Sequence, residues 1–219
     1  MWGHATIEEK KIIQELEKKI DFTGSPIESL IELSILYIEP CHNYEKAIEL
    51  IKSILVRDPE NEMAKILMAF CCIHFLMLDA DLEYGEKLLN EVISNGNENK
   101  GAAYKLLAEV LKDLDKVTFE EEINYLELSV KYEPNWSSNH EVLSTIYEKV
   151  GNFQKALEHM RIAISNISGE NNDWSLAQYY YESIMTGRVS VRKYLEIDLK
   201  KMIEKSHKKK WSIFKRKKK

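Results

Sequence analysis

The residues best suited to chemistry in this sequence are two adjacent cysteines and a nearby histidine, Cys71, Cys72 and His74. Cys71 and His74 are three positions apart, so a helix could present both to a metal such as Zn²⁺. The surrounding segment, KILMAFCCIHFLML, is otherwise apolar, and buried cysteine often behaves as a small hydrophobic residue. Two ligands are too few, and Cys41 and His42 would have to come from elsewhere in the fold. We therefore expect a packed helix here, with no metal and no other cofactor.

Sequence motifs of common enzyme classes are absent. The chain contains no G-x-x-x-x-G-K-[ST], G-x-G-x-x-G, H-E-x-x-H or G-x-S-x-G segment. The three cysteines are too few and too unevenly spaced for a disulfide framework, which is typical of a reducing compartment. The opening residues, MWGHATIEEKK, carry no apolar signal segment. We expect a cytoplasmic protein that is not an enzyme.

The elements that position these residues are predicted to be helices. Only 8 Gly and 4 Pro occur in 219 residues, so long stretches run without a helix breaker. Four stretches resemble one another, and each has an early apolar residue at Tyr44, Leu82, Phe119 or Phe153. Three positions later comes a slot for a small residue, occupied by Ala47, Gly85, Glu122 and Ala156. Four positions further on is a large apolar residue: Ile51, Leu89, Leu126 and Met160. This spacing predicts one apolar face of a helix.

A second predicted helix precedes each of these stretches. It pairs a large apolar residue with a small one, at Leu33-Ser34, Met68-Ala69, Leu107-Ala108 and Leu143-Ser144. Three residues after the small residue stands Tyr37, Cys72, Leu111 or Tyr147. The small residue would let two helices approach closely, and the large ones would fill the space between them.

This pattern resembles the tetratricopeptide repeat, which runs W-x2-L-G-x2-Y…A-x3-F…P over about 34 residues. Pro59 and Pro134 match the closing proline, and Gly151-Asn152-Phe153 matches the turn within a pair. The consensus tryptophan is absent, and the second and third pairs depart most from the pattern. The resemblance covers residues 26–168 and implies an all-α superhelix, a solenoid of stacked antiparallel helix pairs.

The flanking segments complete the expected domain organisation. Residues 1–25 are predicted to form an N-terminal capping helix, and residues 26–168 the four repeat-like pairs. Residues 169–205 are expected to form a C-terminal capping pair, whose first helix is predicted over 173–186, and residues 206–219 a basic tail. Terminal units of solenoids are usually atypical because they cap the stack.

The resemblance implies that the first helix of each pair lines a concave groove. The groove residues expected to bind a partner are Ile31, Ile35, Met63, Leu67, Phe70, Lys105, Glu109, Ser138, Val142 and Thr145. Some tetratricopeptide cochaperones hold a peptide's terminal carboxylate with Lys, Asn and Arg, and only Lys105 could serve here. The groove is therefore expected to bind an amphipathic helix or an extended apolar peptide.

The charge divides the chain into an acidic part and a basic part. Residues 1–199 hold 20 Lys/Arg and 35 Asp/Glu, a net of −15, and residues 200–219 hold 11 Lys/Arg and one acid, a net of +10. A basic amphipathic helix is predicted to run from Val189 into the tail. The expected tail contacts are Lys208, Lys209, Lys210, Trp211, Phe214, Lys215 and Arg216. Two alternative interpretations are a solvated tail and a tail that folds onto the acidic body and occupies its groove.

These observations lead to three functional hypotheses. The first is a non-catalytic protein-interaction scaffold or adaptor that binds a protein or peptide partner in the groove. The second is a bacterial immunity protein or regulator whose acidic body neutralises a basic toxin. The third is association of the tail with an anionic membrane surface, which the interleaved aromatic residues favour slightly over nucleic acid. The sequence does not determine the oligomeric state.

Overall fold

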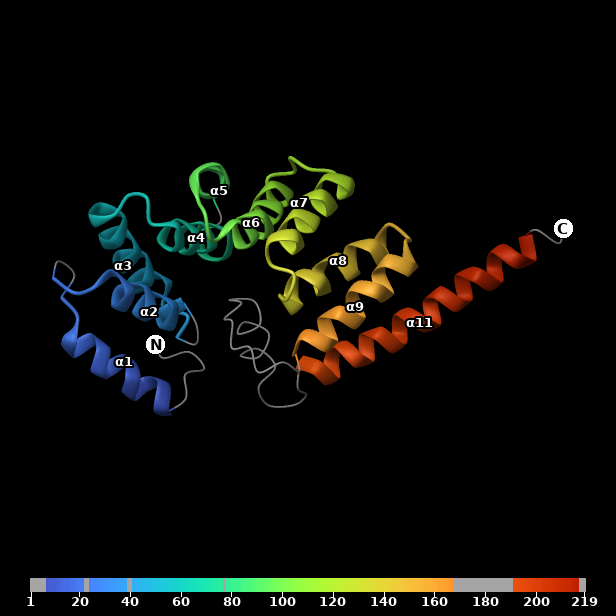
Figure 1. Cartoon of the computed structure of the whole chain (residues 1–219), viewed down its shortest axis with the longest axis horizontal. Coiled ribbons are helices and arrows are strands. Elements are labelled where there is room, and N and C mark those ends of the chain that lie inside the picture. Colours follow the sequence, from blue (N-terminus) through green and yellow to red (C-terminus); the bar gives the residue numbers. More distant parts are fainter. Residues whose placement is uncertain (1–6, 22–23, 39–40, 77, 168–190, 217–219) are drawn as a thin grey trace. The chain divides into compact units, whose positions relative to one another are not determined.

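A computed structural model describes residues 7–21, 24–38, 41–76, 78–167 and 191–216 of the chain. It divides into two compact units, residues 1–118 and residues 119–219. Figure 1 labels the helices of each unit. All regular elements in these ranges are helices, which confirms the all-α solenoid predicted from the sequence. None of the described helices is long and apolar enough to cross a membrane.

Unit 1 consists of consecutive helices that pack on their neighbours. Its elements are α1 (Ile7–Lys19), α2 (Ile27–Ile38), α3 (Tyr44–Arg57), α4 (Glu62–Cys71), the π-helical turn η1 (Cys72–Leu76), α5 (Asp79–Asn95) and α6 (Lys100–Asp113). α2 packs on α1 and α3, and α5 packs on α4 and α6. The helices α2, α4 and α6, which are the predicted first helices of pairs, also contact one another in that order.

Unit 2 repeats this arrangement and adds a long final helix. Its described elements are α7 (Phe119–Tyr132), α8 (Ser137–Lys149), α9 (Phe153–Ile167) and α11 (Val191–Arg216). α8 packs on α7 and α9, and α11 packs along α9. The predicted helix over 173–186 lies outside the described residues. The predicted continuous helix into the tail is confirmed from residue 191 to residue 216.

The core contains the residues that the repeat pattern selects. The four large residues of the second helices, at positions 51, 89, 126 and 160, are all at most 2% exposed. The large and small partners of the first helices, from Leu33-Ser34 to Leu143-Ser144, are equally buried. A Cβ added at Gly85 would lie 3.3 Å from the Cys72 Cβ and 3.6 Å from the Ala69 Cα. The small slot therefore lets α4 and α5 approach closely.

In three of the turns between helices, a backbone hydrogen bond returns to the end of the preceding helix. His42, Asp115 and Gly151 have φ values of 51°, 53° and 80°, in the left-handed region. The next residue donates its backbone N–H to a carbonyl of the preceding helix: Asn43 to Tyr37, Lys116 to Leu111 and Asn152 to Tyr147, at 2.7–2.8 Å. The bonds of Lys116 and Asn152 span five residues, as in the Schellman arrangement that satisfies carbonyls at a helix end, whereas the bond of Asn43 spans six. Asn43 and Asn152 then accept a backbone N–H of the following helix, from Lys46 and Lys155.

The loop between α5 and α6 is held by one carboxylate. Glu62 at the start of α4 accepts backbone N–H groups from Asn97 (2.7 Å), Glu98 (3.3 Å) and Asn99 (3.1 Å), and the Asn99 amide at 3.1 Å. Burial alone would raise the pKa of the Glu62 carboxyl, but these hydrogen bonds outweigh it and hold the pKa below its usual range. Glu62 thereby joins the loop between α5 and α6 to the start of α4.

We predict that this loop requires glycine at position 96. A Cβ there would lie 2.5 Å from the Val92 carbonyl oxygen and 2.8 Å from the Glu62 Cδ. Gly96→Ala should therefore lower the free energy of unfolding by roughly 1–3 kcal/mol, as overpacking does. Gly24→Ala is the matched control, because among the described residues its Cβ would meet the flexible Asp21 side chain, at 3.1 Å, and no backbone. Urea denaturation of the two variants tests this, and equal losses would contradict it.

Candidate functional site

The predicted groove residues of unit 1 lie on three neighbouring helices, but they differ in exposure. Ile31 and Ile35 on α2 and Met63 on α4 are half-buried. Leu67 and Phe70 lie in the core, at 0% and 6% exposure. Because α2 contacts α4 and α4 contacts α6, these positions belong to adjacent helices. In unit 1 the accessible apolar surface of this set is therefore the α2 pair together with Met63.

The structure brings two predicted groove residues together with a histidine. The Phe70 and His74 rings lie 4.2 Å apart between centroids, and the His74 Nε2 is 3.5 Å from a Glu109 carboxylate oxygen. Burial raises the pKa of Glu109, but His74 and the nearby charge of Lys105 outweigh it and lower the pKa. Lys105 is only 9% exposed. We call His74, Lys105 and Glu109, together with the Phe70 ring, the unit 1 polar cluster; its members come from η1, α4 and α6.

The π-helical turn η1 explains why helical spacing in the sequence did not predict the contact of His74 with Phe70 and Glu109. Cys71 and Cys72 are fully buried, as predicted, and burial raises the pKa of their thiols to about 12 and about 11. His74 instead has a side chain 33% exposed, and Phe75 is 40% exposed and stacks on Tyr44 at 5.1 Å. A π-helical turn contains an extra residue relative to an α-helix, so it shifts the side chains that follow. Regular α-helical spacing could not show this.

The described residues contain no group of three or more His, Cys, Asp or Glu side chains that could hold a metal ion.

The predicted groove residues of unit 2 also differ in position. All three come from α8: Ser138 is 3% exposed, Val142 is half-buried and Thr145 is exposed. The Thr145 hydroxyl donates to the Glu141 carbonyl at 3.1 Å. Val142 and Thr145 are thus the two predicted groove residues of α8 that solvent reaches.

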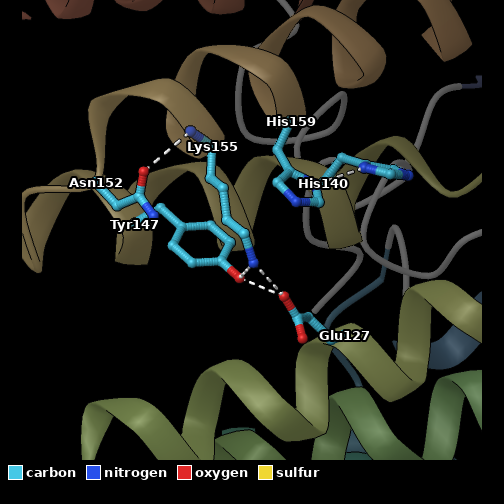
Figure 2. A network of polar contacts seen from close by, with 6 residues as sticks. All are labelled: Glu127, His140, Tyr147, Asn152, Lys155 and His159. Carbon is cyan, nitrogen blue, oxygen red and sulfur yellow. Dashed lines mark hydrogen bonds and ion pairs between the residues drawn. The ribbon is translucent and has the colours of Figure 1, made fainter.

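A polar network joins three consecutive helices of unit 2. Glu127 on α7 accepts the hydroxyl of Tyr147 on α8 and the ammonium of Lys155 on α9, the latter at 3.0 Å (Figure 2). The Lys155 Nζ also donates to the Tyr147 hydroxyl at 2.8 Å and lies 4.7 Å from that ring's centroid. The hydrogen bonds from Tyr147 and Lys155 lower the pKa of Glu127. Each of the three helices contributes one member.

Unit 1 contains the same network at nearly the same sequence spacing. Glu17 on α1 accepts the hydroxyl of Tyr37 on α2 and the ammonium of Lys46 on α3, at 2.7 Å for Lys46. The tyrosine follows the glutamate by 20 residues in both units, and the lysine follows it by 29 or 28. We call both the Glu–Tyr–Lys network. α1 therefore takes the place in unit 1 that α7, a predicted second helix of a pair, takes in unit 2.

A histidine pair adjoins the network of unit 2. The His140 Nε2 lies 2.9 Å from the Pro134 carbonyl oxygen, so this nitrogen carries the proton. The His140 Nδ1, 2.9 Å from the His159 Nδ1, must then accept a hydrogen bond from it. The His159 ring also stacks on Tyr147, with centroids 5.6 Å apart. Burial lowers the pKa of both histidines, and their mutual repulsion lowers that of His159 further.

The predicted tail contacts are described only in part. Lys208 is exposed. Lys209, Lys210, Trp211, Phe214, Lys215 and Arg216 belong to α11, but their side chains lie outside the described part of the structure. The structure therefore places the tail residues along one helix.

Comparison with known proteins identifies the fold. No protein-family model matches the chain, and no curated protein does. A solved thermophilic TPR protein of Thermus thermophilus aligns with a TM-score of 0.60 at 14% identity, over 80% of this chain and 90% of that one. A crystal structure of MamA aligns with a TM-score of 0.52 at 18% identity, over 73% and 89%. The chain thus has a tetratricopeptide-like helical-repeat fold over most of its length.

We predict that the Glu–Tyr–Lys network stabilises unit 1. Tyr37→Phe removes the hydroxyl that Glu17 accepts and should lower the free energy of unfolding by about 1 kcal/mol. Tyr84→Phe is the control, because Tyr84 is 43% exposed and belongs to the same unit. Urea denaturation should show a loss for Tyr37→Phe alone. A loss of the same size for Tyr84→Phe would contradict the prediction.

The histidine pair predicts a specific pH dependence. Both folded pKa values lie below the unfolded value of about 6.5, so the unfolded chain binds more protons as the pH falls through that value. The melting temperature should therefore fall between about pH 7 and pH 5.5. Glu127 and Glu158 oppose this shift at His159, and Lys155 adds to it.

His159→Gln tests the assignment. It removes one titrating ring, so the variant should lose less stability than the wild type over the same pH interval. Glu127 does not obscure the comparison, because its lowered pKa affects stability only below about pH 4.5. Thermal unfolding followed by circular dichroism measures both proteins. An equal or larger loss in His159→Gln would refute the role of the pair.

Proposed function

Because the chain folds as a tetratricopeptide-like solenoid, we propose that it is a non-catalytic scaffold or adaptor that binds a protein or peptide partner. The observation that carries the proposal is the row of adjacent first helices α2, α4 and α6 in unit 1. Solenoids of this kind present extended surfaces that suit a polypeptide better than a small molecule. No sequence motif for catalysis competes with this interpretation.

The surface of this row favours a partner with both apolar and polar groups. Ile31 and Ile35 share one face of α2, one helical turn apart, and both are half-buried. Glu28 and Glu32 on the same helix are exposed. At the other end of the row stand His74 and Glu109 of the unit 1 polar cluster. An amphipathic helix with basic residues beside its apolar face would complement both features.

The charge of the chain supports a basic partner. Residues 1–199 carry a net charge of −15, which would accelerate encounter with a positively charged protein. A basic toxin that this chain neutralises, as an immunity protein would, is a narrower candidate on the same grounds. Binding of such a toxin should depend on salt concentration, because electrostatic steering weakens as ionic strength rises.

We predict that the α2 pair contributes to partner binding. Full-length chain immobilised on beads should retain a specific partner from the native host at physiological salt. The double variant Ile31→Gln and Ile35→Gln should reduce retention of that partner at least tenfold, because central apolar contacts dominate most interfaces. The control is Val56→Gln, which changes an apolar residue that is 82% exposed on the second helix α3. Circular dichroism confirms that the variants remain folded.

The outcomes separate clearly. If the α2 variant and the Val56→Gln control reduce retention equally, the α2 pair is not the binding site. Absence of any partner that binds the wild type above the background of bare beads would overturn the scaffold proposal itself.

A further inference from the structure

The helix α11 is the last element of unit 2 that the structure describes. It runs beside α9 and extends past it (Figure 1). Met202 and Ser206, one turn apart, are 2% and 9% exposed, and the Lys205 ammonium bonds to Glu148 at 2.6 Å. His207 and Lys208 are exposed. Helix geometry then carries the backbone about 15 Å further, from residue 206 to Arg216.

The register of α11 separates its packing face from a second stripe. Met202 and Ser206 define the face toward the core. Ile203 follows Met202 and is half-buried. His207 follows Ser206 and is exposed. At 3.6 residues per turn, Trp211 and Phe214 fall on the stripe of Ile203 and His207. The two aromatic residues therefore occupy helix positions that do not continue the packing face.

The extension is strongly basic. From Lys208 to Arg216 it contains five Lys or Arg and no acid, whereas residues 1–199 carry a net charge of −15. No Asp or Glu follows Glu204 in the sequence, so no acidic residue between Lys208 and Arg216 offsets these positive charges. The charge and the stripe together define an amphipathic surface of basic and aromatic residues.

We propose that residues 207–216 of α11 dock on an anionic membrane surface. Lysine and arginine would contact acidic lipid headgroups, while Trp211 and Phe214 would lie at the level of the headgroups and upper acyl chains. Nucleic acid would use the same charges but would need no aromatic stripe along a helix to contact a duplex backbone. This proposal concerns residues of unit 2, whereas the α2 pair belongs to unit 1, and it does not depend on the proposed scaffold function.

The test measures sedimentation of the full chain with vesicles. One vesicle type is phosphatidylcholine alone and the other contains about one-third phosphatidylserine. The wild type should bind only the anionic vesicles, and each lysine near the surface should contribute about fivefold in affinity. The variant Lys208→Gln, Lys209→Gln, Lys210→Gln should therefore bind about 100-fold more weakly. The matched control removes three exposed lysines of the solenoid, Lys52, Lys87 and Lys131, and should bind as the wild type does.

A second variant tests the aromatic stripe. Trp211→Ser with Phe214→Ser leaves the charge unchanged and should still lower vesicle affinity at least tenfold, whereas retention on duplex DNA should stay weak and unaltered. Binding of the wild type to neutral and anionic vesicles alike, or equal loss in the solenoid control, would overturn the proposal. Strong DNA retention without vesicle binding would replace the membrane with nucleic acid.

Discussion

The helices that the structure describes depend on their neighbours to bury one apolar face. A single amphipathic helix cannot cover that face, so stability requires stacking of consecutive helices. Stacking in turn requires close approach, which residues such as Ser34, Ala69 and Ala156 permit because they are small and fully buried. At Gly85 even a methyl group would lie 3.3 Å from Cys72.

The two Glu–Tyr–Lys networks show how polar groups add to that apolar stacking. Each tyrosine has its ring at the packed interface and its hydroxyl at the edge, where a glutamate from the preceding helix and a lysine from the following helix reach it. The backbone carbonyl of the same tyrosine also accepts an N–H in the turn that follows it. Three successive helices are thus joined at one side chain. The recurrence of the network shows that α1 and α7 occupy equivalent places in their units.

The accessible groups are divided between separate parts of the molecule. In unit 1, half-buried isoleucines lie on α2, and the polar cluster lies on η1, α4 and α6. In unit 2, α11 carries basic residues C-terminal to Lys205, which bonds to Glu148 on α8. The protein-binding surface proposed for unit 1 and the basic helix of unit 2 have opposite charge requirements, and they lie on different helices.

The sequence by itself determined the four repeat-like helix pairs, the core positions that the repeat selects and the turn at Gly151, because these depend on spacing along the chain. Leu33, Ile51 and Leu143 could be placed in the core from an apolar period alone. Tertiary structure decided which predicted groove residues remain accessible, since burial of Leu67 and Ser138 depends on neighbouring helices. It also placed His74 beside Glu109, because the π-helical turn changes the side-chain register and the partner lies on another helix. Contacts between residues 20 to 35 positions apart, such as Glu17 with Tyr37, have no local pattern from which they could be predicted.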